Sequence, residues 1–483
     1  MINGYIPQKD RKKILLLCDD IRFQSGISTM AREIVVGTCH VYNWINLGGA
    51  INHPEQGMKL DISQDTNKVA GIPDSSVFIY PINGYGTQEV VRQLIHIEKP
   101  DAIMIFTDPR YWIWLFQMEN EIRKTIPLMY INIWDDLPAP LYNKPYYESC
   151  DALFAISKQT KLINELVLGD KAKDKVIKYV PHGINEKQFY PINEFMKEEN
   201  DKLLEMKKRI LADKEYEFVL FYNARNIRRK CVPDLLAAWR VFCDKVGKER
   251  ASKTALLLHT QALDENGTDL PAVIELLDEN EINNVIINQD RLSTYDLNIM
   301  YNMCDAVALV SSNEGWGLSL TEGMMCGKPI IATVTGGMQD QMRFLDDKGK
   351  WFTPSKDMPS NHFGTFGKHG VWAYPVFPSN MSLVGSIPTP YIWDDRADFR
   401  DIATQILRVY SVKTETPEIF AKAGKAAREW VTSEESMMTA KRMCDNIVDG
   451  INQTLSEWKP RKNFEFIKIK NLEPKKILHP LTY

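Results

Sequence analysis

The chain has 483 residues, enough for two or three domains at roughly 150 residues each. Hydrophobic residues make up 44% and charged residues 25%, and 59 Lys and Arg against 63 Asp and Glu give a net charge of −4. This composition is typical of a globular protein and excludes disordered, collagen-like and disulfide-scaffold chains. The mild acidity also argues against a protein that grips nucleic acid with its whole surface.

No apolar run reaches the ~18 residues that a membrane span requires, and residues 1–13 lack the apolar core of a signal peptide. The eight cysteines form no CxxC pair and show no regular spacing. This pattern predicts buried thiols in a reducing compartment rather than a zinc site or disulfides. We therefore expect a cytoplasmic, enzyme-like protein without an integral membrane segment.

Short apolar runs alternate with helical patterns through the first half of the chain. The first unit combines a strand at 14–18, a loop at 21–26 and a helix at 27–38. Such units build parallel α/β sheets. Further strands are predicted at 102–106, 128–133, 152–156 and 176–180.

The same alternation restarts after a charged, helix-prone segment at 194–214. A helix is predicted at 232–246, and strands at 217–222, 254–258, 284–287, 306–310 and 329–334. The predicted fold class is α/β, with two Rossmann-like doubly wound domains facing a cleft. We expect the domains at 1–190 and 191–430, and at 431–483 a helix that packs back toward the first domain, followed by a basic tail.

One stretch departs from this pattern. Residues 351–391, within an insertion predicted at about 344–395, contain six prolines and many aromatic residues and fit neither a helix nor a regular strand. Because the stretch is too aromatic for a disordered linker, we expect an ordered insertion. Helices are predicted to resume at 398–409 and 433–451, and beyond Trp458 the tail carries seven Lys or Arg against two Glu.

The strongest chemical signal lies where the strand at 306–310 ends. The chain there reads Glu314-Gly315-Trp316-Gly317-Leu318 and continues into a helix that carries Glu322. Glycines let backbone amides approach a phosphate at a helix N-terminus, and ionised carboxylates accept hydrogen bonds from sugar hydroxyls. We predict a site for a phosphorylated sugar, with Glu322 on a ribose diol. A surface helix with ordinary glutamates is the alternative.

Two other loops at predicted strand ends suit phosphates. Arg225 and Lys230 follow the strand at 217–222 and are predicted to clamp a diphosphate and stabilise a leaving group. A solvated basic loop is the alternative. Gly26 opens the first helix and is compatible with a phosphate, but without a GxGxxG motif a tight turn without a ligand fits equally well.

These motifs resemble the nucleotide-sugar domain of family 4 glycosyltransferases, which have the GT-B fold. The family signature E-G-x-G-L-x-x-x-E is matched by residues 314–322, and the element G-R-x4-K-G resembles 224–231 with both glycines replaced. Weaker similarities lie at 182–185, 297–305 and 336–337. The resemblance covers about residues 12–340 and the C-terminal helices.

The resemblance also implies roles for these residues. Arg225 and Lys230 would hold the donor diphosphate, Glu314 and the backbone of Gly315, Trp316, Gly317 and Leu318 the donor sugar, Glu322 the ribose, and Gly26 would approach the phosphate. It further implies a UDP-glucose-like donor, transfer with retention, catalysis mainly by the phosphate-stabilising cations, and no cofactor or metal ion.

A departure from the family occurs after the strand at 128–133. The family often has His-Asp there, whereas this chain has Trp134-Asp135-Asp136. Asp135 matches the aspartate, so Asp135 or Asp136 is predicted to face the acceptor or the sugar, and Asp135 is counted among the catalytic residues. A turn before Leu137 is the alternative. The pairs 19–20 and 346–347 are predicted turns rather than metal ligands.

The phrases at 19–22 and 132–136 also resemble glycosyltransferase-like proteins of tailed phages. This resemblance implies an acceptor hypothesis, a hydroxymethylated base of phage DNA in the host cytoplasm. Aromatic residues of the insertion would stack on bases, and Arg228, Arg229 and the tail would meet phosphates. The same aromatic residues suit the core of the insertion or a sugar acceptor.

Other classes of function remain open at the level of sequence. A nucleotide-sugar epimerase of the same fold would act on the donor without an acceptor. A non-catalytic binder would carry a decayed site, although Arg225, Lys230, Glu314 and Glu322 are all present. A dinucleotide oxidoreductase is disfavoured because the chain has no GxGxxG fingerprint. The sequence predicts no oligomeric state.

Overall fold

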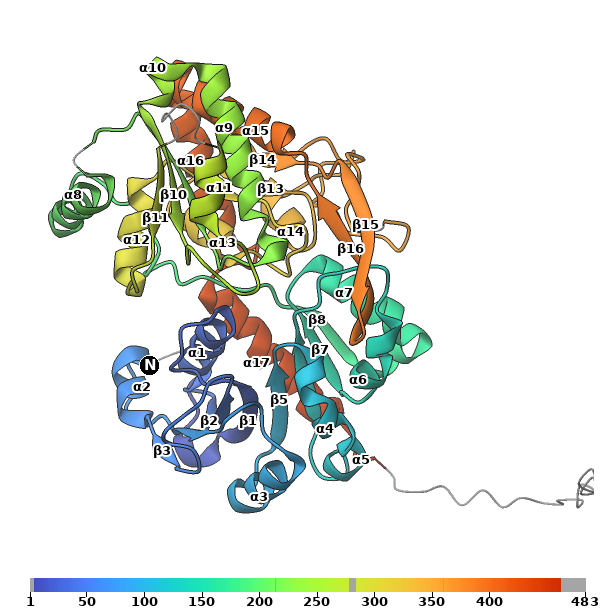
Figure 1. The fold of residues 1–483 in the computed structure, drawn as a ribbon. Helices are drawn as coiled ribbons and strands as arrows, with labels where there is room; N and C mark the ends of the chain where they lie inside the picture. The colour runs from blue at the N-terminus through green and yellow to red at the C-terminus, as the bar shows by residue number, and fades with distance from the viewer. Residues whose placement is uncertain (1–3, 213, 278–283, 359, 462–483) are drawn as a thin grey trace, which may run out of the picture.

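Two mainly parallel β-sheets, each covered by helices, form the two halves of the molecule (Figure 1). The computed structural model describes residues 4–212, 214–277, 284–358 and 360–461. We call the part built on the first sheet the first domain and the part built on the second sheet the second domain. The predicted α/β fold class with two doubly wound domains is confirmed.

The first sheet has eight strands in the order β3-β4-β2-β1-β5-β6-β7-β8, and only β3 runs antiparallel to its neighbour. Its central strands are apolar throughout, as expected for strands buried on both faces. The order reverses between β1 and β5. The strands are β1 (Lys12–Asp19), β2 (Tyr42–Gly49), β3 (Leu60–Asp61), β4 (Val77–Pro81), β5 (Ala102–Phe106), β6 (Leu128–Asn132), β7 (Ala152–Ala155) and β8 (Val176–Tyr179).

Strands β2, β3 and β4 were not predicted from the sequence. Strand β2 mixes apolar residues with asparagine and glycine, so it has no continuous apolar run. Asn46 lies buried in this strand because its side chain accepts a hydrogen bond from Ile21 N at 3.2 Å and donates to Leu16 O at 3.3 Å. A buried polar residue that is satisfied in this way hides the strand from a hydrophobicity pattern.

The second sheet is parallel, with the order β11-β10-β9-β12-β13-β14. Here the order reverses between β9 and β12, so their carboxyl ends flank a topological switch point. The strands are β9 (Phe218–Asn223), β10 (Thr254–His259), β11 (Val285–Asn288), β12 (Ala306–Leu309), β13 (Ile330–Thr333) and β14 (Ala373–Val376).

Several helices begin at a serine or threonine whose side chain caps the first turn, such as Ser25, Ser157 and Thr439. The helices of the first domain are α1 (Gly26–Thr38), α2 (Ser63–Ala70), α3 (Gln88–Glu98), α4 (Ile113–Phe116), α5 (Glu119–Ile122), α6 (Lys144–Glu148) and α7 (Lys158–Leu168). The second domain has α8 (Lys197–Leu211), α9 (Val232–Val246), α10 (Lys248–Ala251), α11 (Leu270–Leu277), α12 (Thr294–Met303), α13 (Leu318–Met325), α14 (Met338–Met342), α15 (Phe399–Glu415) and α16 (Pro417–Val431).

The last helix, α17 (Ala440–Glu457), crosses back to the first domain (Figure 1). Tyr42 Oη donates a hydrogen bond to Asn452 Oδ1 of this helix at 2.8 Å. The predicted helix start at 433 is wrong, because 433–439 is a turn in which Thr439 forms a β-bridge with Ile184 and then caps α17. Helix α16 was not predicted.

The aromatic stretch is ordered, but the prediction that it contains no regular strand is wrong. Strand β14 joins the second sheet, and β15 (Asn380–Ser386) and β16 (Thr389–Arg396) form an antiparallel hairpin. Phe344, Phe352 and Phe366 surround the buried His362 ring, with centroids 4.2, 5.6 and 5.2 Å away. Phe344, Phe352 and Phe366 thus belong to a core within the insertion, whereas Phe363 is 57% exposed and Tyr391 contacts the first domain. The base-stacking interpretation stays a prediction.

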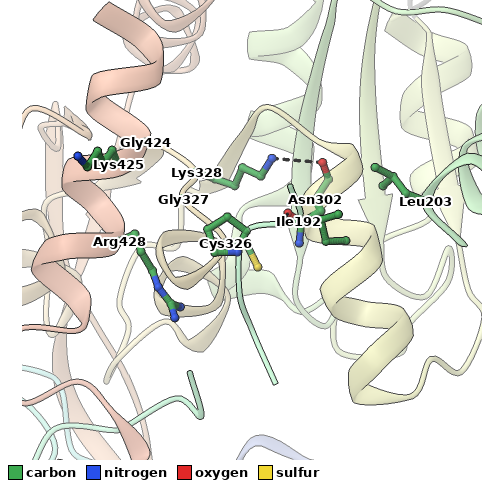
Figure 2. Close-up of a pocket in the computed structure, with 10 residues that line it drawn as sticks. Ile192, Leu203, Asn302, Cys326, Gly327, Lys328, Gly424, Lys425 and Arg428 are labelled. Atoms are coloured by element: carbon green, nitrogen blue, oxygen red, sulfur yellow. Dashed lines mark hydrogen bonds between the residues drawn. The ribbon is translucent and has the colours of Figure 1, made fainter. Parts of the chain in front are cut away.

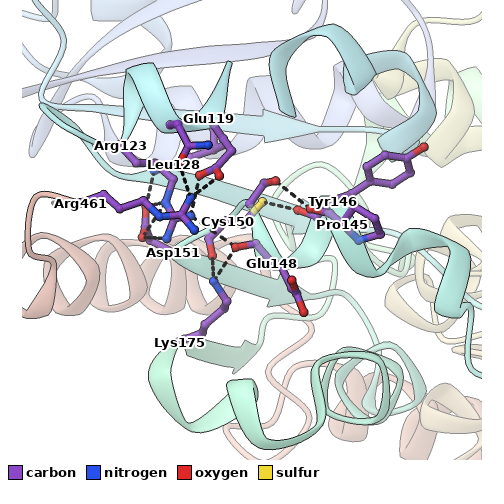
Figure 3. A network of polar contacts seen from close by, with 12 residues as sticks. Glu119, Arg123, Leu128, Pro145, Tyr146, Glu148, Cys150, Asp151, Lys175 and Arg461 are labelled. Atoms are coloured by element: carbon purple, nitrogen blue, oxygen red, sulfur yellow. Dashed lines mark hydrogen bonds and ion pairs between the residues drawn. The ribbon is translucent and has the colours of Figure 1, made fainter. Parts of the chain in front are cut away.

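The end of the described chain docks onto the first domain. Arg461 N donates to Arg123 O at 2.8 Å, and the Arg461 guanidinium contacts Glu119 (Figure 3). Arg123 in turn pairs with Asp151, at 2.7 Å, where β7 begins. This network lies at the amino ends of β6 and β7, opposite the edge where ligands of parallel sheets bind. The predicted basic tail beyond residue 461 lies outside the described residues.

All eight cysteines are buried and free, as the sequence predicted. Within 4–461, apart from the short gaps named above, no helix is both long and apolar enough to cross a membrane.

Candidate functional site

The carboxyl ends of the two sheets meet at one interface between the domains. A Cβ added at Gly315, which follows β12, would lie 2.9 Å from Ile133 O, which follows β6. A Cβ added at Gly26, which follows β1, would lie 3.2 Å from Leu318 Cδ1. The loops predicted to bind ligand on the two domains are therefore in contact.

Glu314 lies at the centre of a charged cluster at this interface. Its Oε2 accepts hydrogen bonds from Arg229 Nη1 at 2.9 Å, from Lys230 Nζ, and from Ser311 Oγ at 3.2 Å. Although burial alone would raise the pKa of Glu314, Arg229 and Lys230 lower it to about 2. The carboxylate is therefore ionised at neutral pH, and two cations against one carboxylate leave a local excess of one positive charge.

Arg225 does not join this cluster. Its guanidinium is 61% exposed and pairs with Asp264, with Nε 2.6 Å from Oδ2. The sequence singled out Arg225 and Lys230, and the structure brings only Lys230 to Glu314. Arg229, which the sequence analysis assigned to nucleic-acid phosphates, occupies the second cationic position. The signal that could have found it is its place directly before Lys230 at the end of the same strand–loop unit.

Asp135 and Asp136 approach the cluster from the first domain. The Asp135 side chain faces Arg229 and Glu314, and burial raises its pKa against the opposing effect of Arg229. Asp136 is buried beside Asp135, and its Oδ1 has no hydrogen-bond partner. Burial and the neighbouring carboxyl raise the pKa of Asp136 well above its ordinary value. Both carboxyl groups are therefore protonated more readily than an exposed aspartate.

The loop that carries these aspartates is fixed by α7. Gln159 Nε2 donates to Asp135 O at 2.6 Å, and Thr160 Oγ1 donates to Trp134 O at 2.7 Å. The backbone of this loop is therefore tied to α7 of the first domain. Whether Asp135 or Asp136 faces the acceptor or the sugar stays a prediction beside the alternative of a turn before Leu137.

Two helix N-termini converge where Gly26 meets Leu318. Helix α1 begins at Gly26, and helix α13 begins at Leu318 after Gly317, which has a φ of 78° and gives no side-chain cap. In α1 the Ser25 side chain accepts from Ser28 N, whereas the first-turn amides of α13 have no side-chain cap. Free first-turn amides and the positive ends of the helix dipoles favour an anion. Facing N-termini on two domains suit the phosphates of a nucleotide better than either would alone.

Glu322 and Trp316 have different surroundings. Glu322 is buried in α13, where its Oε2 accepts from Tyr301 Oη at 2.6 Å, and Tyr301 Oη accepts from Asn223 Nδ2 at 3.0 Å. Burial raises the pKa of Glu322 to about 7. Trp316 is 2% exposed and its Nε1 donates to Thr321 Oγ1, so its side chain supports the loop from inside.

A separate cavity of about 430 Å³ lies at the other end of α13 (Figure 2). Lys328 and Arg428 line it, but Lys328 Nζ donates to Asn302 O at 3.2 Å and Arg428 Nη1 to Met325 O at 2.7 Å. These cations therefore bind backbone carbonyls. In the parts of the chain that the structure describes, no group of three or more His, Cys, Asp or Glu is placed to hold a metal ion.

Comparison with known proteins identifies the second domain. Residues 204–358 match the family model described as "Glycosyl transferases group 1". This segment, less than half of the chain, is similar to that family. The match supports the predicted glycosyltransferase activity and agrees with the family 4 resemblance. Among curated proteins none matches the chain.

Solved structures share the whole fold. HepE of Anabaena, in complex with UDP and glucose, is 13% identical and aligns over 92% of this chain and 100% of its own, with a TM-score of 0.60. Sucrose-phosphate synthase of Thermosynechococcus elongatus is 14% identical over 92% and 100%, with a TM-score of 0.63. An E. coli trehalose-6-phosphate protein bound with UDP-2-fluoro glucose is 11% identical over 92% and 99%, with a TM-score of 0.59. The structural similarity, at these low sequence identities, shows the GT-B fold.

Proposed function

We propose that the chain transfers glucose or a similar hexose from a UDP-sugar to a hydroxyl acceptor, with retention of the anomeric configuration. The observation that carries the proposal is the convergence of the α1 and α13 N-termini beside Lys230, Arg229 and Glu314. HepE and the E. coli protein have the same fold and are bound to UDP or a UDP-sugar, which supports UDP-glucose as the first donor to test.

The cations explain how the leaving group departs. When the bond between the sugar and the diphosphate breaks, negative charge grows on the diphosphate, and preorganised cations stabilise that charge in a water-poor site. Arg229 and Lys230 pair with Glu314. The donor phosphates would share these cations, and Glu314 would then accept hydrogen bonds from sugar hydroxyls.

The remaining roles complete the proposal. Glu322, with Tyr301 and Asn223, would bind the ribose diol. The leaving phosphate would take the acceptor proton on the same face of the sugar, as the family resemblance implies. Because two protein cations carry the charge on the diphosphate, we propose that the transfer needs no metal ion and that activity persists in EDTA.

The acceptor would bind on the first domain, near Asp135 and Asp136. Tyr85 and Tyr111, which follow β4 and β5 at the carboxyl edge of the same sheet, stack with ring centroids 4.3 Å apart, and Tyr111 is 50% exposed. Aromatic faces of this kind suit a sugar ring. The narrower hypothesis, a hydroxymethylated base in phage DNA, has a reduced stacking surface in the insertion, because Phe352 and Trp372 are buried, although Phe363 is 57% exposed.

Binding and product analysis test the proposal. We would titrate UDP, GDP and ADP by calorimetry and then incubate the protein with UDP-glucose alone and with candidate acceptors, including hydroxymethylated DNA. Selective UDP binding and slow release of UDP and glucose are expected. A new nucleotide-sugar formed from the donor alone would instead indicate an epimerase, and binding of GDP or ADP but not UDP would overturn the donor assignment.

A further inference from the structure

We infer that the β15–β16 hairpin is a positioning element of the transfer site. It belongs to the second domain, yet it grips the loop of the first domain that carries Asp135 and Asp136, and so holds that loop against Glu314. The inference rests on the proposed function for the roles of those carboxyl groups. Figure 1 shows the hairpin reaching from the second domain past α7 toward the first domain.

The root of the hairpin is fixed beside Glu314. Asp395 N donates to Ser312 O at 3.0 Å, two residues before Glu314. The Asp395 side chain is 1% exposed and accepts hydrogen bonds from Thr335 Oγ1 at 2.7 Å and from Asn361 Nδ2 at 3.2 Å. A buried carboxyl group with several partners makes a rigid joint, so the hairpin moves with the loop that carries Glu314.

The middle of the hairpin clasps the first domain directly after Asp136. Trp393 N donates to Leu137 O at 2.9 Å, and Tyr142 Oη donates to Tyr391 O at 2.9 Å. Tyr391 Oη donates to Ala139 O at 3.2 Å and accepts from Leu141 N at 3.3 Å. One hydroxyl and two backbone groups of β16 thus bond to four residues of the contact segment 137–142, namely Leu137, Ala139, Leu141 and Tyr142.

The far end of the hairpin reaches a second loop of the first domain. Thr389 Oγ1, in a largely buried side chain, accepts a hydrogen bond from Arg110 Nη1. Arg110 follows β5, pairs with Asp108, and lies 5.8 Å from the Trp134 ring next to Asp135. The turn between β15 and β16, where Ile387 is fully exposed, projects away from these contacts.

This arrangement explains why the insertion exists in a transferase. The reacting groups lie on different domains, and misplacement by about 1 Å can cost roughly a hundredfold in rate. The hairpin is bonded to Ser312, two residues before Glu314, and to residues 137–142, one to six residues after Asp136. It therefore sets the distance between the Glu314 loop and the Asp136 loop. Tyr391 is the residue through which most of that grip passes.

The test compares Tyr391→Phe with Tyr410→Phe in the full chain. Tyr391→Phe keeps the ring and removes the hydroxyl that bonds to Ala139 and Leu141. Tyr410→Phe removes a hydroxyl that donates to Glu217 in the second domain, away from the contact segment. Two readouts are taken: amide hydrogen exchange over 133–142, which needs no ligand, and the kcat and KM for release of UDP from UDP-glucose.

We expect Tyr391→Phe to speed exchange in 133–142 by about tenfold or more, as the loss of the two hydrogen bonds of the hydroxyl predicts. We also expect kcat to fall by about tenfold or more with the KM for UDP-glucose within about twofold of wild type. Tyr410→Phe should change neither. Should Tyr391→Phe prove too mild, the double variant with Thr389→Val removes the Arg110 contact as well.

Each outcome tests one step of the inference about the hairpin. Unchanged exchange in the double variant would show that the hairpin does not hold the loop, and faster exchange with unchanged kcat would show that the grip does not serve the reaction. Either result overturns the inference. If the wild-type chain neither binds UDP nor releases it from UDP-glucose, the proposed donor fails, and the exchange experiment still decides whether the hairpin holds the loop.

Discussion

Glu314 pairs with Arg229 and Lys230, whereas Arg225, on the same loop at 224–231, does not join this cluster. Arg229 reaches Glu314 at 2.9 Å, and Arg225 reaches Asp264 at 2.6 Å and is largely exposed. Arg229 and Lys230 lie together at Glu314, so the proposed leaving diphosphate would meet two cations at once. The charge of the exposed Arg225, paired with Asp264, is screened by water.

Arg229→Ala and Lys230→Ala should therefore each lower kcat for UDP release by about a hundredfold or more, by analogy with other charge-stabilising donors. Arg225→Ala should lower it by less than about tenfold, since an exposed ion pair contributes little. Steady-state kinetics with UDP-glucose measure all three, with Arg228→Ala on the same loop as the control. A larger effect of Arg225→Ala than of Arg229→Ala would show that Arg225, rather than Arg229, stabilises the leaving diphosphate.

The raised pKa of Glu322 gives a second prediction, which concerns the pH dependence of stability. Its pKa is raised by burial from 4.5 to about 7, so the native state binds the proton more tightly than the unfolded chain. The stability associated with the protonated group is complete below about pH 4.5 and is lost as pH rises through about 7. Glu322→Gln keeps a neutral acceptor for Tyr301 and should not lose this stability.

Thermal unfolding at pH 5 and pH 8 checks the pH prediction. At pH 8 the Glu322→Gln variant should be more stable than wild type by on the order of 1–3 kcal/mol, while at pH 5 the two should be close. Glu275→Gln, at an exposed position on α11, is the control and should not change the pH dependence. A Glu322→Gln variant less stable than wild type at pH 8 would contradict it.

At the level of single residues, the sequence could predict Glu314 and Lys230 because strand-end positions of parallel sheets gather at one edge. It could not choose between Arg225 and Arg229. That choice depends on the short turn at 228–230 and on Cys231, whose φ of 52° reverses the chain direction before α9. Spacing alone does not contain that turn, so the sequence could not show that Arg229 rather than Arg225 pairs with Glu314. The role of Arg225 at the donor diphosphate stays a prediction.

At the scale of elements, the loops after β12 and β13 are packed backbone to backbone. Gly336 has a φ of 49°, and a Cβ there would lie 2.1 Å from Glu314 O. Gly337 N donates to the same carbonyl at 3.0 Å. The glycine pair thus fixes the backbone of Glu314, and a side chain at 336 must displace it.

Gly336→Ala should weaken UDP binding by about tenfold or more, because it moves the loop that carries the site. Gly349→Ala is a matched control, since Gly349 also has a positive φ, 75°, but has nothing within 4 Å of an added Cβ. Both variants place a side chain at a positive φ. Calorimetric titration with UDP therefore separates the effect of backbone strain from the effect of displacing the Glu314 backbone. Equal losses of UDP affinity in the two variants would show that Gly336 does not position the backbone of Glu314.

The elements that the sequence missed share a physical cause. Strand β2 contains a satisfied buried asparagine and two glycines, and β14 lies in a stretch whose prolines argue against a sheet. Pro375 is tolerated because β14 is the edge strand of its sheet. The hairpin β15–β16 carries exposed Leu383 and Ile387, so its alternation gives no clear buried face. Tertiary contacts, not local pattern, define these strands.

At the scale of the whole molecule, contacts far apart in sequence hold the two domains together. Asp340 of α14 accepts from Lys158 N of α7 at 2.9 Å, and Lys158 Nζ lies 3.4 Å from the Trp351 ring centroid. Helix α17 adds a third connection by returning to the first domain. The sequence analysis expected a C-terminal helix that packs back toward the first domain, but not the turn that precedes it.

The docking of α17 depends on a glycine. A Cβ added at Gly450 would lie 2.6 Å from Cε1 of Phe154, a fully buried ring on β7. In an exposed helix interior, Gly→Ala stabilises by about 1 kcal/mol. Here the added methyl group meets a ring that cannot move aside, and overpacking costs about 1–3 kcal/mol, so Gly450→Ala should destabilise or at best leave stability unchanged.

Ser456→Ala, at an exposed position of the same helix, should stabilise slightly, so the two variants should differ in sign. Thermal unfolding measures both. Because α17 joins the end of the second domain to the first, loosening it should also lower kcat for UDP release more than it raises the Kd for UDP, whose proposed phosphate site does not include α17. A Gly450→Ala chain more stable than wild type would mean that α17 packs less closely on β7 than the 2.6 Å approach requires.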